Sequence, residues 1–219
     1  MTSDPVHEVM LRSVGVSLTA TLLACLVAVP LGTALALGRL SGRRVTVALV
    51  NTGMAVPTVV VGLAVATLLW RSGPLGSLGL IYTLRGMVVA QVLIAVPLVT
   101  GVTMASLHML PPELPDQLRA LGASRTQTVW RLWREAKLPI LVAAMAGFGH
   151  AVSEVGAATI VGGNIHGRTQ VMTTAIVEDV GRGEFGTALA YGAVLLALAL
   201  GVNAVLVSVQ RREVVWARP

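Results

Sequence analysis

The chain has 219 residues, of which 55% are hydrophobic and 12% are charged, and its formal net charge is +6. Soluble domains carry about 25% charged residues, so this composition excludes an ordinary water-soluble globular protein and indicates a chain that lies largely in lipid. Cys25 is the only cysteine, which excludes an internal disulfide, and no cluster of His and Cys suggests a metal site.

Five apolar stretches are each long enough to cross a bilayer core, which takes about 20 residues of helix. We therefore expect an all-α transmembrane protein with five spans, at residues 13–37, 45–70, 86–110, 138–162 and 187–209. Prolines lie inside three of these spans, at Pro30, Pro57 and Pro97. Each removes a backbone donor and favours a kink, which serves either ordinary packing or a hinge near a pathway.

The distribution of basic residues predicts the orientation in the membrane. Eleven of the sixteen lysines and arginines lie in the segments 39–44, 119–137 and 211–218, and the other five are Arg12, Arg71, Arg85, Arg168 and Arg182. Basic residues are in excess on the cytoplasmic side. We therefore expect an extracytoplasmic N-terminus at 1–12, a cytoplasmic hairpin at 111–137 and a cytoplasmic tail at 210–219, in the cell (inner) membrane of a bacterium or archaeon. The net charge then follows from topology, and a nucleic-acid partner is not needed.

The segment 111–137 predicts a helix, a sharp turn and a second helix. Pro115 suits a first helical turn, and the Asp116 carboxylate suits the positive end of that helix. Gly122 is typical of a helix C-terminus, and Ser124 with Gln127 forms a capping-box pattern for the next helix. The segment is either an amphipathic stretch lying flat on the inner leaflet or a knob that fits a groove in a partner protein. A tight turn between two capped helices favours the knob.

Residues 120–124, Ala-Leu-Gly-Ala-Ser, followed by Leu138-Pro139, resemble the cytoplasmic "EAA" loop of the type I permeases of bacterial ABC importers. In that family the loop forms a coupling helix that docks into a cleft of the ATP-binding subunit. The Glu-Ala-Ala positions hold Asp116, Gln117 and Leu118 here, and the spacing to Leu-Pro is longer by about one helical turn. The resemblance implies docking through Asp116, Arg119, Ala120, Leu121, Gly122, Ala123 and Ser124.

A second stretch resembles the oxyanion branch of the same permeases. It comprises Ser-Glu-Val-Gly-Ala-Ala at 153–158, Gly-Gly-Asn-Ile at 162–165, and Gly167, Thr169 and residues 172–176. The residue pattern most closely resembles that of tungstate-type permeases, and molybdate and sulfate are the alternative substrates. The resemblance implies a pair of partner ATPase subunits inside and a solute-binding protein outside. Because five helices are too few to enclose a gated pathway, we expect a homodimer with the path on its two-fold axis.

Polar residues inside the fourth span are candidates for a pathway or gate. His150 and Glu154 are four residues apart and share a helix face, and a carboxylate inside a membrane span is a functional candidate by default. Glu154 either pairs with His150, accepts backbone amides where the helix breaks at Gly156, or orders a gate; a bare carboxylate would repel an anion. The candidates for the path or gate are His150, Ser153, Glu154, Gly156, Gly163, Asn164 and Thr169. Ser153 with His150 lacks the geometry of a nucleophilic site.

The loop from Asn164 to Phe185 offers donors that suit an oxyanion, among them His166, Arg168 and Thr169, or it is simply a solvated loop. We expect a short interfacial helix at 171–180 that acts as an outer gate.

The sequence contains no phosphate loop of the type Gly-x-x-x-x-Gly-Lys-Ser/Thr. ATP and Mg²⁺ are therefore expected on a partner chain, and this chain is expected to be no enzyme and to hold no cofactor. The sequence thus predicts the membrane-spanning permease of an ABC importer for an oxyanion. The rival interpretations are an ATP-independent channel or secondary transporter, which would need inverted repeats, and a membrane scaffold.

Overall fold

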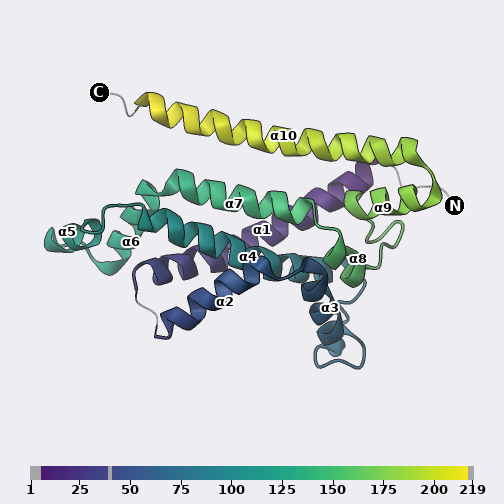
Figure 1. The fold of residues 1–219 in the computed structure, drawn as a ribbon, viewed down its shortest axis with the longest axis horizontal. Coiled ribbons are helices and arrows are strands. Elements are labelled where there is room, and N and C mark those ends of the chain that lie inside the picture. The colour runs from purple at the N-terminus through teal and green to yellow at the C-terminus, as the bar shows by residue number, and fades with distance from the viewer. Residues whose placement is uncertain (1–5, 39–40, 217–219) are drawn as a thin grey trace.

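A computed structural model describes residues 6–38 and 41–216, and within them all regular structure is helical (Figure 1). The predicted all-α class is confirmed. The helices are α1 (Val6–Ala36), α2 (Arg43–Ala55), α3 (Thr58–Leu69), the 3₁₀ turn η1 (Gly76–Leu78), α4 (Leu84–His108), α5 (Leu114–Ala120), α6 (Arg125–Glu135), α7 (Lys137–Val152), α8 (Gly156–Gly162), α9 (Met172–Arg182) and α10 (Phe185–Trp216).

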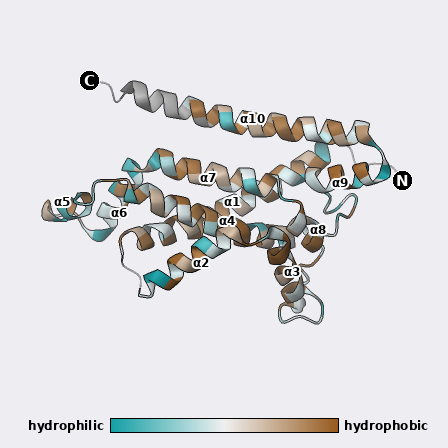
Figure 2. Ribbon diagram, viewed as in Figure 1, coloured by the Kyte–Doolittle hydropathy of each residue, from teal (hydrophilic) through white to brown (hydrophobic). Residues whose placement is uncertain are grey.

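Three helices, α1, α4 and α10, are each long and apolar enough to cross a bilayer alone, and there are five crossings if each of two bent helix pairs counts as one. Figure 2 shows hydrophobic residues along most of their length. The three long helices coincide with the predicted spans at 13–37, 86–110 and 187–209. Both α1 and α10 extend past these spans, because backbone hydrogen bonding does not stop where hydropathy falls. Residues 1–5 and 217–219 of the predicted termini, and two of residues 39–44, lie outside the described residues.

The predicted second span, at 45–70, is not one continuous helix. Helices α2 and α3 meet at an angle of 105°, and Pro57 lies at the junction. Val56, the residue before it, is extended with a ψ of 130°, as the proline ring requires of its predecessor. Pro30 and Pro97, in contrast, lie inside the uninterrupted helices α1 and α4.

The predicted fourth span, at 138–162, is also broken. Helix α7 ends at Val152, α8 begins at Gly156, and the two are inclined by 59°. The three intervening residues include Glu154, whose side chain binds the start of α8, as described below.

The centre of the molecule is the packing of α1 against α4, which make the most extensive contact between helices. Small and hydroxyl residues permit this close approach, as is usual for helices in lipid. A Cβ added to Gly32 of α1 would lie 2.8 Å from the carbonyl oxygen of Thr100 on α4. Helix α7 packs on both, with Ala28, Val99 and Ala143 forming one buried cluster.

The second halves of the two broken spans, α3 and α8, pack on each other. A Cβ added to Gly62 of α3 would lie 2.6 Å from the Cα of Ala157 on α8, and Ala157 is fully buried. Since neither atom is the free end of a flexible side chain, only a shift of the helices can relieve the clash.

We expect Gly62→Ala to lower the stability of the protein by ~1–3 kcal/mol, because overpacking forces such a shift. The measurement is the apparent melting temperature in detergent. The control is Gly15→Ala on α1, where an added Cβ meets nothing within 4 Å and alanine improves helix propensity. Equal melting temperatures for the two variants would contradict the described packing of α3 on α8.

Candidate functional site

The hairpin predicted at 111–137 is present, as α5, a tight turn and α6. The turn is a complete Schellman motif: the Ala123 amide donates to the Leu118 carbonyl (3.0 Å), and the Gly122 amide donates to the Arg119 carbonyl (2.9 Å). Gly122 has a φ of 86°, in the left-handed region that favours glycine, and an added Cβ would meet nothing within 4 Å. Glycine is therefore needed here for its backbone conformation and not for lack of space.

The second helix of the hairpin begins with the predicted capping box. The Gln127 amide donates to Ser124 Oγ at 3.3 Å, and the Ser124 amide donates to Gln127 Oε1 at 2.7 Å. Asp116 and Arg119 form an exposed ion pair on α5 at 3.1 Å. Leu121, at the tip, has 85% of its surface exposed. The hairpin is thus a rigid knob with an apolar tip.

The base of the knob is fixed to the two central helices. Leu132 of α6 and Ala136, the residue after that helix, are buried together with Leu107 of α4, against the C-terminal end of α1. Trp133 Nε1 donates a hydrogen bond to Thr33 Oγ1 of α1 at 2.8 Å. A force on the tip therefore reaches α1 and α4 through packed side chains.

The break between α7 and α8 is organised by Glu154. Its Oε1 accepts the Ala157 amide at 2.8 Å, and its main-chain carbonyl accepts the Thr173 hydroxyl at 2.7 Å. Glu154 is buried. Of the alternatives from the sequence, the acceptance of a backbone amide is the one the structure shows.

The alternative pair between His150 and Glu154 does not form among the described residues. The pairing assumed a continuous helix, but α7 ends at Val152, so the two side chains no longer share a face. His150 and Ser153 are exposed, and the Ser153 hydroxyl donates to the carbonyls of Gly149 and His150.

The loop after α8 contains the remaining path candidates. Gly163 has a φ of 73°, and an added Cβ would lie 2.6 Å from Tyr82 Cδ1. Thr169 Oγ1 donates to the Gly162 carbonyl at 2.6 Å and accepts the Ile165 amide at 2.9 Å. Both residues therefore shape the loop. Gly156 packs closely too, since an added Cβ would lie 2.5 Å from Val59 Cγ2.

Glu178 of α9 is the centre of a cluster that the sequence reasoning missed. Asn164 Nδ2 and Gln170 Nε2 lie 2.7 Å and 2.8 Å from its Oε2, and His166 Nε2 lies 3.0 Å from its Oε1. Arg182, four residues along α9, forms an ion pair with it. That i, i+4 spacing was the signal available in the sequence.

Burial raises the pKa of Glu178, but the hydrogen bonds from His166 and Asn164 and the charges of His166 and Arg182 outweigh it. The pKa of this carboxyl therefore lies below its ordinary value. Through these contacts the Glu178 carboxylate fixes the loop 164–170 to α9. Helix α9, at Met172–Arg182, is the short helix expected at 171–180.

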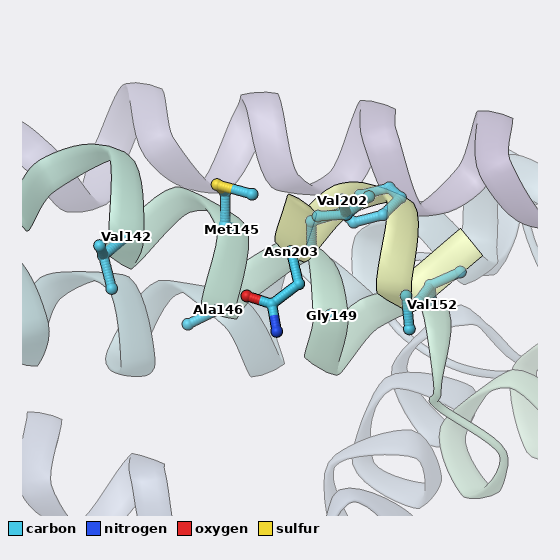
Figure 3. A pocket seen from close by; sticks show the side chains of 9 residues that line it. Val142, Met145, Ala146, Gly149, Val152, Val202 and Asn203 are labelled. Atoms are coloured by element: carbon cyan, nitrogen blue, oxygen red, sulfur yellow. The ribbon is translucent and has the colours of Figure 1, made fainter. Parts of the chain in front are cut away.

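A groove of about 290 Å³ lies between α7 and α10. It is almost entirely apolar, and Figure 3 shows the Asn203 amide of α10 beside Ala146 and Gly149 of α7. Asn203 was also missed; it is an amide within an apolar span, and no hydrogen bond of its side chain is found in the described part of the chain. Such side chains favour hydrogen bonding between helices in a membrane.

The predicted docking residues and the predicted path residues are not brought together. The α5–α6 hairpin lies at one end of the molecule, and α8, α9 and their loop lie toward the other (Figure 1). The structure therefore has two candidate sites, a knob at one end and a broken span with a latched loop at the other.

The family of binding-protein-dependent transport system inner membrane components matches residues 28–214. The chain belongs to this family. The resemblance to ABC importer permeases noted in the sequence is thereby confirmed.

Two relatives of this permease are each 39% identical to it. One, over 88% of this chain and 85% of its own, is a probable anion ABC transporter permease protein of Haloferax volcanii. The other, over 94% of this chain and 91% of its own, is the tungstate uptake system permease protein TupB of Peptoclostridium acidaminophilum.

The permease also has the fold of a chain in the inward-facing structures of the MetNI methionine ABC transporter. The TM-score is 0.75, the identity is 17%, and the match covers 96% of this chain and 99% of that one. At that identity the likeness concerns the fold alone.

We expect Glu154→Ala to destabilise the permease by ~1–3 kcal/mol, because it leaves the Ala157 amide buried without its acceptor. Glu154→Gln keeps an acceptor oxygen at the same reach and should lose less. The apparent melting temperature in detergent measures both, with Glu135→Ala, on the exposed face of α6, as the control. Identical losses for Glu154→Ala and Glu154→Gln would contradict the capping role.

We expect the contacts between the Glu178 carboxylate and the loop 164–170 to weaken in acid. Because the folded-state pKa is lowered, the carboxylate stabilises the fold above its unfolded-state pKa of about 4.3, and this stability is lost as the pH falls through the folded-state value. Glu178→Gln should therefore melt at a lower temperature than the unsubstituted permease at about pH 5, and the gap should close toward about pH 3. A gap that is constant over that range would show that the charge of Glu178 contributes nothing.

Proposed function

We propose that this chain is the membrane-spanning permease subunit of an ABC importer for an oxyanion, most specifically tungstate. It acts as a homodimer in the cell membrane. A separate ATP-binding subunit on the cytoplasmic side drives it, and an extracytoplasmic binding protein delivers the substrate. ATP and Mg²⁺ belong to the partner, since the sequence has no phosphate loop.

The observation that carries the proposal is the rigid, capped knob of α5 and α6 with its exposed Leu121. A surface segment lying flat on a membrane has no need of a Schellman turn followed at once by a capping box. An exposed leucine at the tip of such a turn is the kind of anchor that fills a pocket on a partner protein. The Trp133–Thr33 hydrogen bond and the buried Leu132 provide the connection from that partner to α1 and α4.

The substrate class is supported by the relatives, of which one is named for anions and two for tungstate. Sulfate permease proteins are more distant; the CysT protein of Escherichia coli is 31% identical over 74% of this chain and 61% of its own. Sulfate and molybdate are therefore the competing substrates. All are tetrahedral dianions, so the same donor chemistry would serve each of them.

A second copy is supported by the surface of α10. Only 11% of the apolar window of α10 is buried within the chain, against 44% for α4. The Asn203 amide in the groove beside α7 offers a hydrogen bond to a neighbouring helix. An ATP-independent channel explains neither the knob nor the family.

The excess of basic residues near the knob supports a cytoplasmic knob and an N-terminus outside. On this arrangement ATP binding draws the two knobs of the dimer together, and α1 and α4 transmit the movement to the opposite end of the molecule.

We expect Gly122→Arg to leave the permease in the membrane but to abolish its association with the ATPase subunit. Two effects act together: the left-handed backbone is strained by about 1 kcal/mol, and a long cation stands at the docking tip. The measurements are copurification of the ATPase subunit and ATP-driven tungstate uptake in proteoliposomes, both of which we expect to fall at least tenfold.

The control is Gly183→Arg at the end of α9. Gly183 has a φ of 78°, open space around an added Cβ and the same Schellman pattern, but it lies at the other end of the chain's fold. This variant carries the same backbone strain and should retain the ATPase subunit. Normal uptake by Gly122→Arg, or equal loss of the ATPase subunit from both variants, would overturn the proposal.

A further inference from the structure

A recess of about 430 Å³ lies between the start of α4 and the loop that follows α8. Arg85 lines it from the first turn of α4, and Arg168 lines it from the loop. Thr83, Thr169 and Tyr82 also line it, and none of its lining residues is acidic. The loop after α8, which forms one wall, lies toward the end of the molecule away from the α5–α6 knob (Figure 1).

Neither arginine is neutralised within the part of the chain that the structure describes. Both side chains are exposed, and neither makes an ion pair there. Glu178 contacts the same loop and is a possible counter-ion for Arg168. Its carboxylate is already engaged by Asn164, His166, Gln170 and Arg182. The side chains of Asn164, His166 and Gln170 in this loop are thus used within the chain. The cation of Arg168, in the same loop, is available to a ligand in the recess.

The position of Arg85 is electrostatically unfavourable for the fold alone. A cation in the first turn of a helix faces the positive end of the helix dipole, and no acidic residue of that turn offsets it. With Arg168 on the facing wall, two like charges border one recess without a counter-charge from the chain. An anion bound between them removes both penalties.

Both walls of the recess are tied to the C-terminal end of α8. The Tyr82 amide donates to the Val161 carbonyl at 2.9 Å on the Arg85 side. On the Arg168 side, the Thr169 hydroxyl donates to the Gly162 carbonyl at 2.6 Å. Because both walls are bonded to the same end of α8, a change in the inclination of α8 would displace the walls and the two arginines that line them.

We propose that Arg85 and Arg168 form a binding recess for a tetrahedral oxyanion, which receives the transported dianion at this end of the path and releases it when α8 changes its inclination. The inference rests on the proposed function, whose substrate it places on named residues. Guanidinium groups bind such anions bidentately, with specificity that lysine does not match. Both arginines are exposed, so the proposed binding is screened by solvent and allows the anion to leave.

The first test is equilibrium dialysis of radiolabelled tungstate against the purified full-length permease in detergent, without ATPase or binding protein. We expect the double variant Arg85→Gln/Arg168→Gln to bind at least tenfold more weakly than the unsubstituted chain. Raising the salt from about 0.05 M to about 0.5 M should weaken binding by the unsubstituted chain far more than by the variant. Arg71→Gln, an exposed arginine in the loop after α3 that does not line the recess, is the control and should bind normally.

The second test is uptake by the complete transporter in proteoliposomes. The double variant should retain its ATPase subunit and lose tungstate uptake, and Arg85→Lys/Arg168→Lys should recover only part of it. If the unsubstituted transporter takes up tungstate and the double variant does so equally well, the recess is no substrate site while the proposed function stands. If the unsubstituted transporter carries no oxyanion at all, the proposed function fails.

Two further outcomes would overturn the recess as a substrate site. In the first, the double variant binds tungstate normally but retains less phospholipid on purification. That result would assign the arginines to lipid phosphate. The other is unchanged tungstate binding combined with loss of association with the binding protein, which would assign them to carboxylates of that partner.

Discussion

The structure depends on one constraint, the need of every backbone amide in a bilayer for a hydrogen-bond acceptor. Two predicted spans are interrupted, and each interruption frees backbone groups that a continuous helix would have bonded. At the α7–α8 break, the Glu154 carboxylate supplies the acceptor for the Ala157 amide. At the α2–α3 bend, Pro57 has no amide to satisfy, so a sharp turn of 105° leaves one donor fewer. The broken elements then pack on each other through Gly62 and Ala157.

The two breaks divide the helices into continuous and interrupted ones. Helices α1 and α4 form the continuous centre, and the knob is attached to their ends by Leu132 and by the Trp133–Thr33 hydrogen bond. Helix α8, in contrast, has only seven residues and packs as a separate element against α3 and α4. On the proposed function, a movement that enters through the knob would reach the far end along the continuous helices α1 and α4. That arrangement suits a transporter in which the motor and the gate lie on opposite sides of the membrane.

The loop after α8 contains both polar groups that are bonded within the described part of the chain and a cation that is not. The Glu178 carboxylate takes the donors of Asn164, His166, Gln170 and Arg182, which fixes the loop against α9. Arg168 of the same loop lines the recess together with Arg85. The charge of Glu178 is paired with Arg182, which reduces the repulsion between this carboxylate and the anion that we propose for the recess.

The sequence by itself determined the features that depend on local chemistry. The membrane class followed from composition, and the knob followed from Pro115, Gly122, Ser124 and Gln127, because caps and turns are made by residues close in the chain. Only the tertiary structure decided the rest. It separated His150 from Glu154, joined Glu178 to a loop 14 residues away in sequence at Asn164, and placed Arg85 and Arg168 on the walls of one recess. Those pairings depend on where helices break and which faces then meet, and helical periodicity carries no information about either.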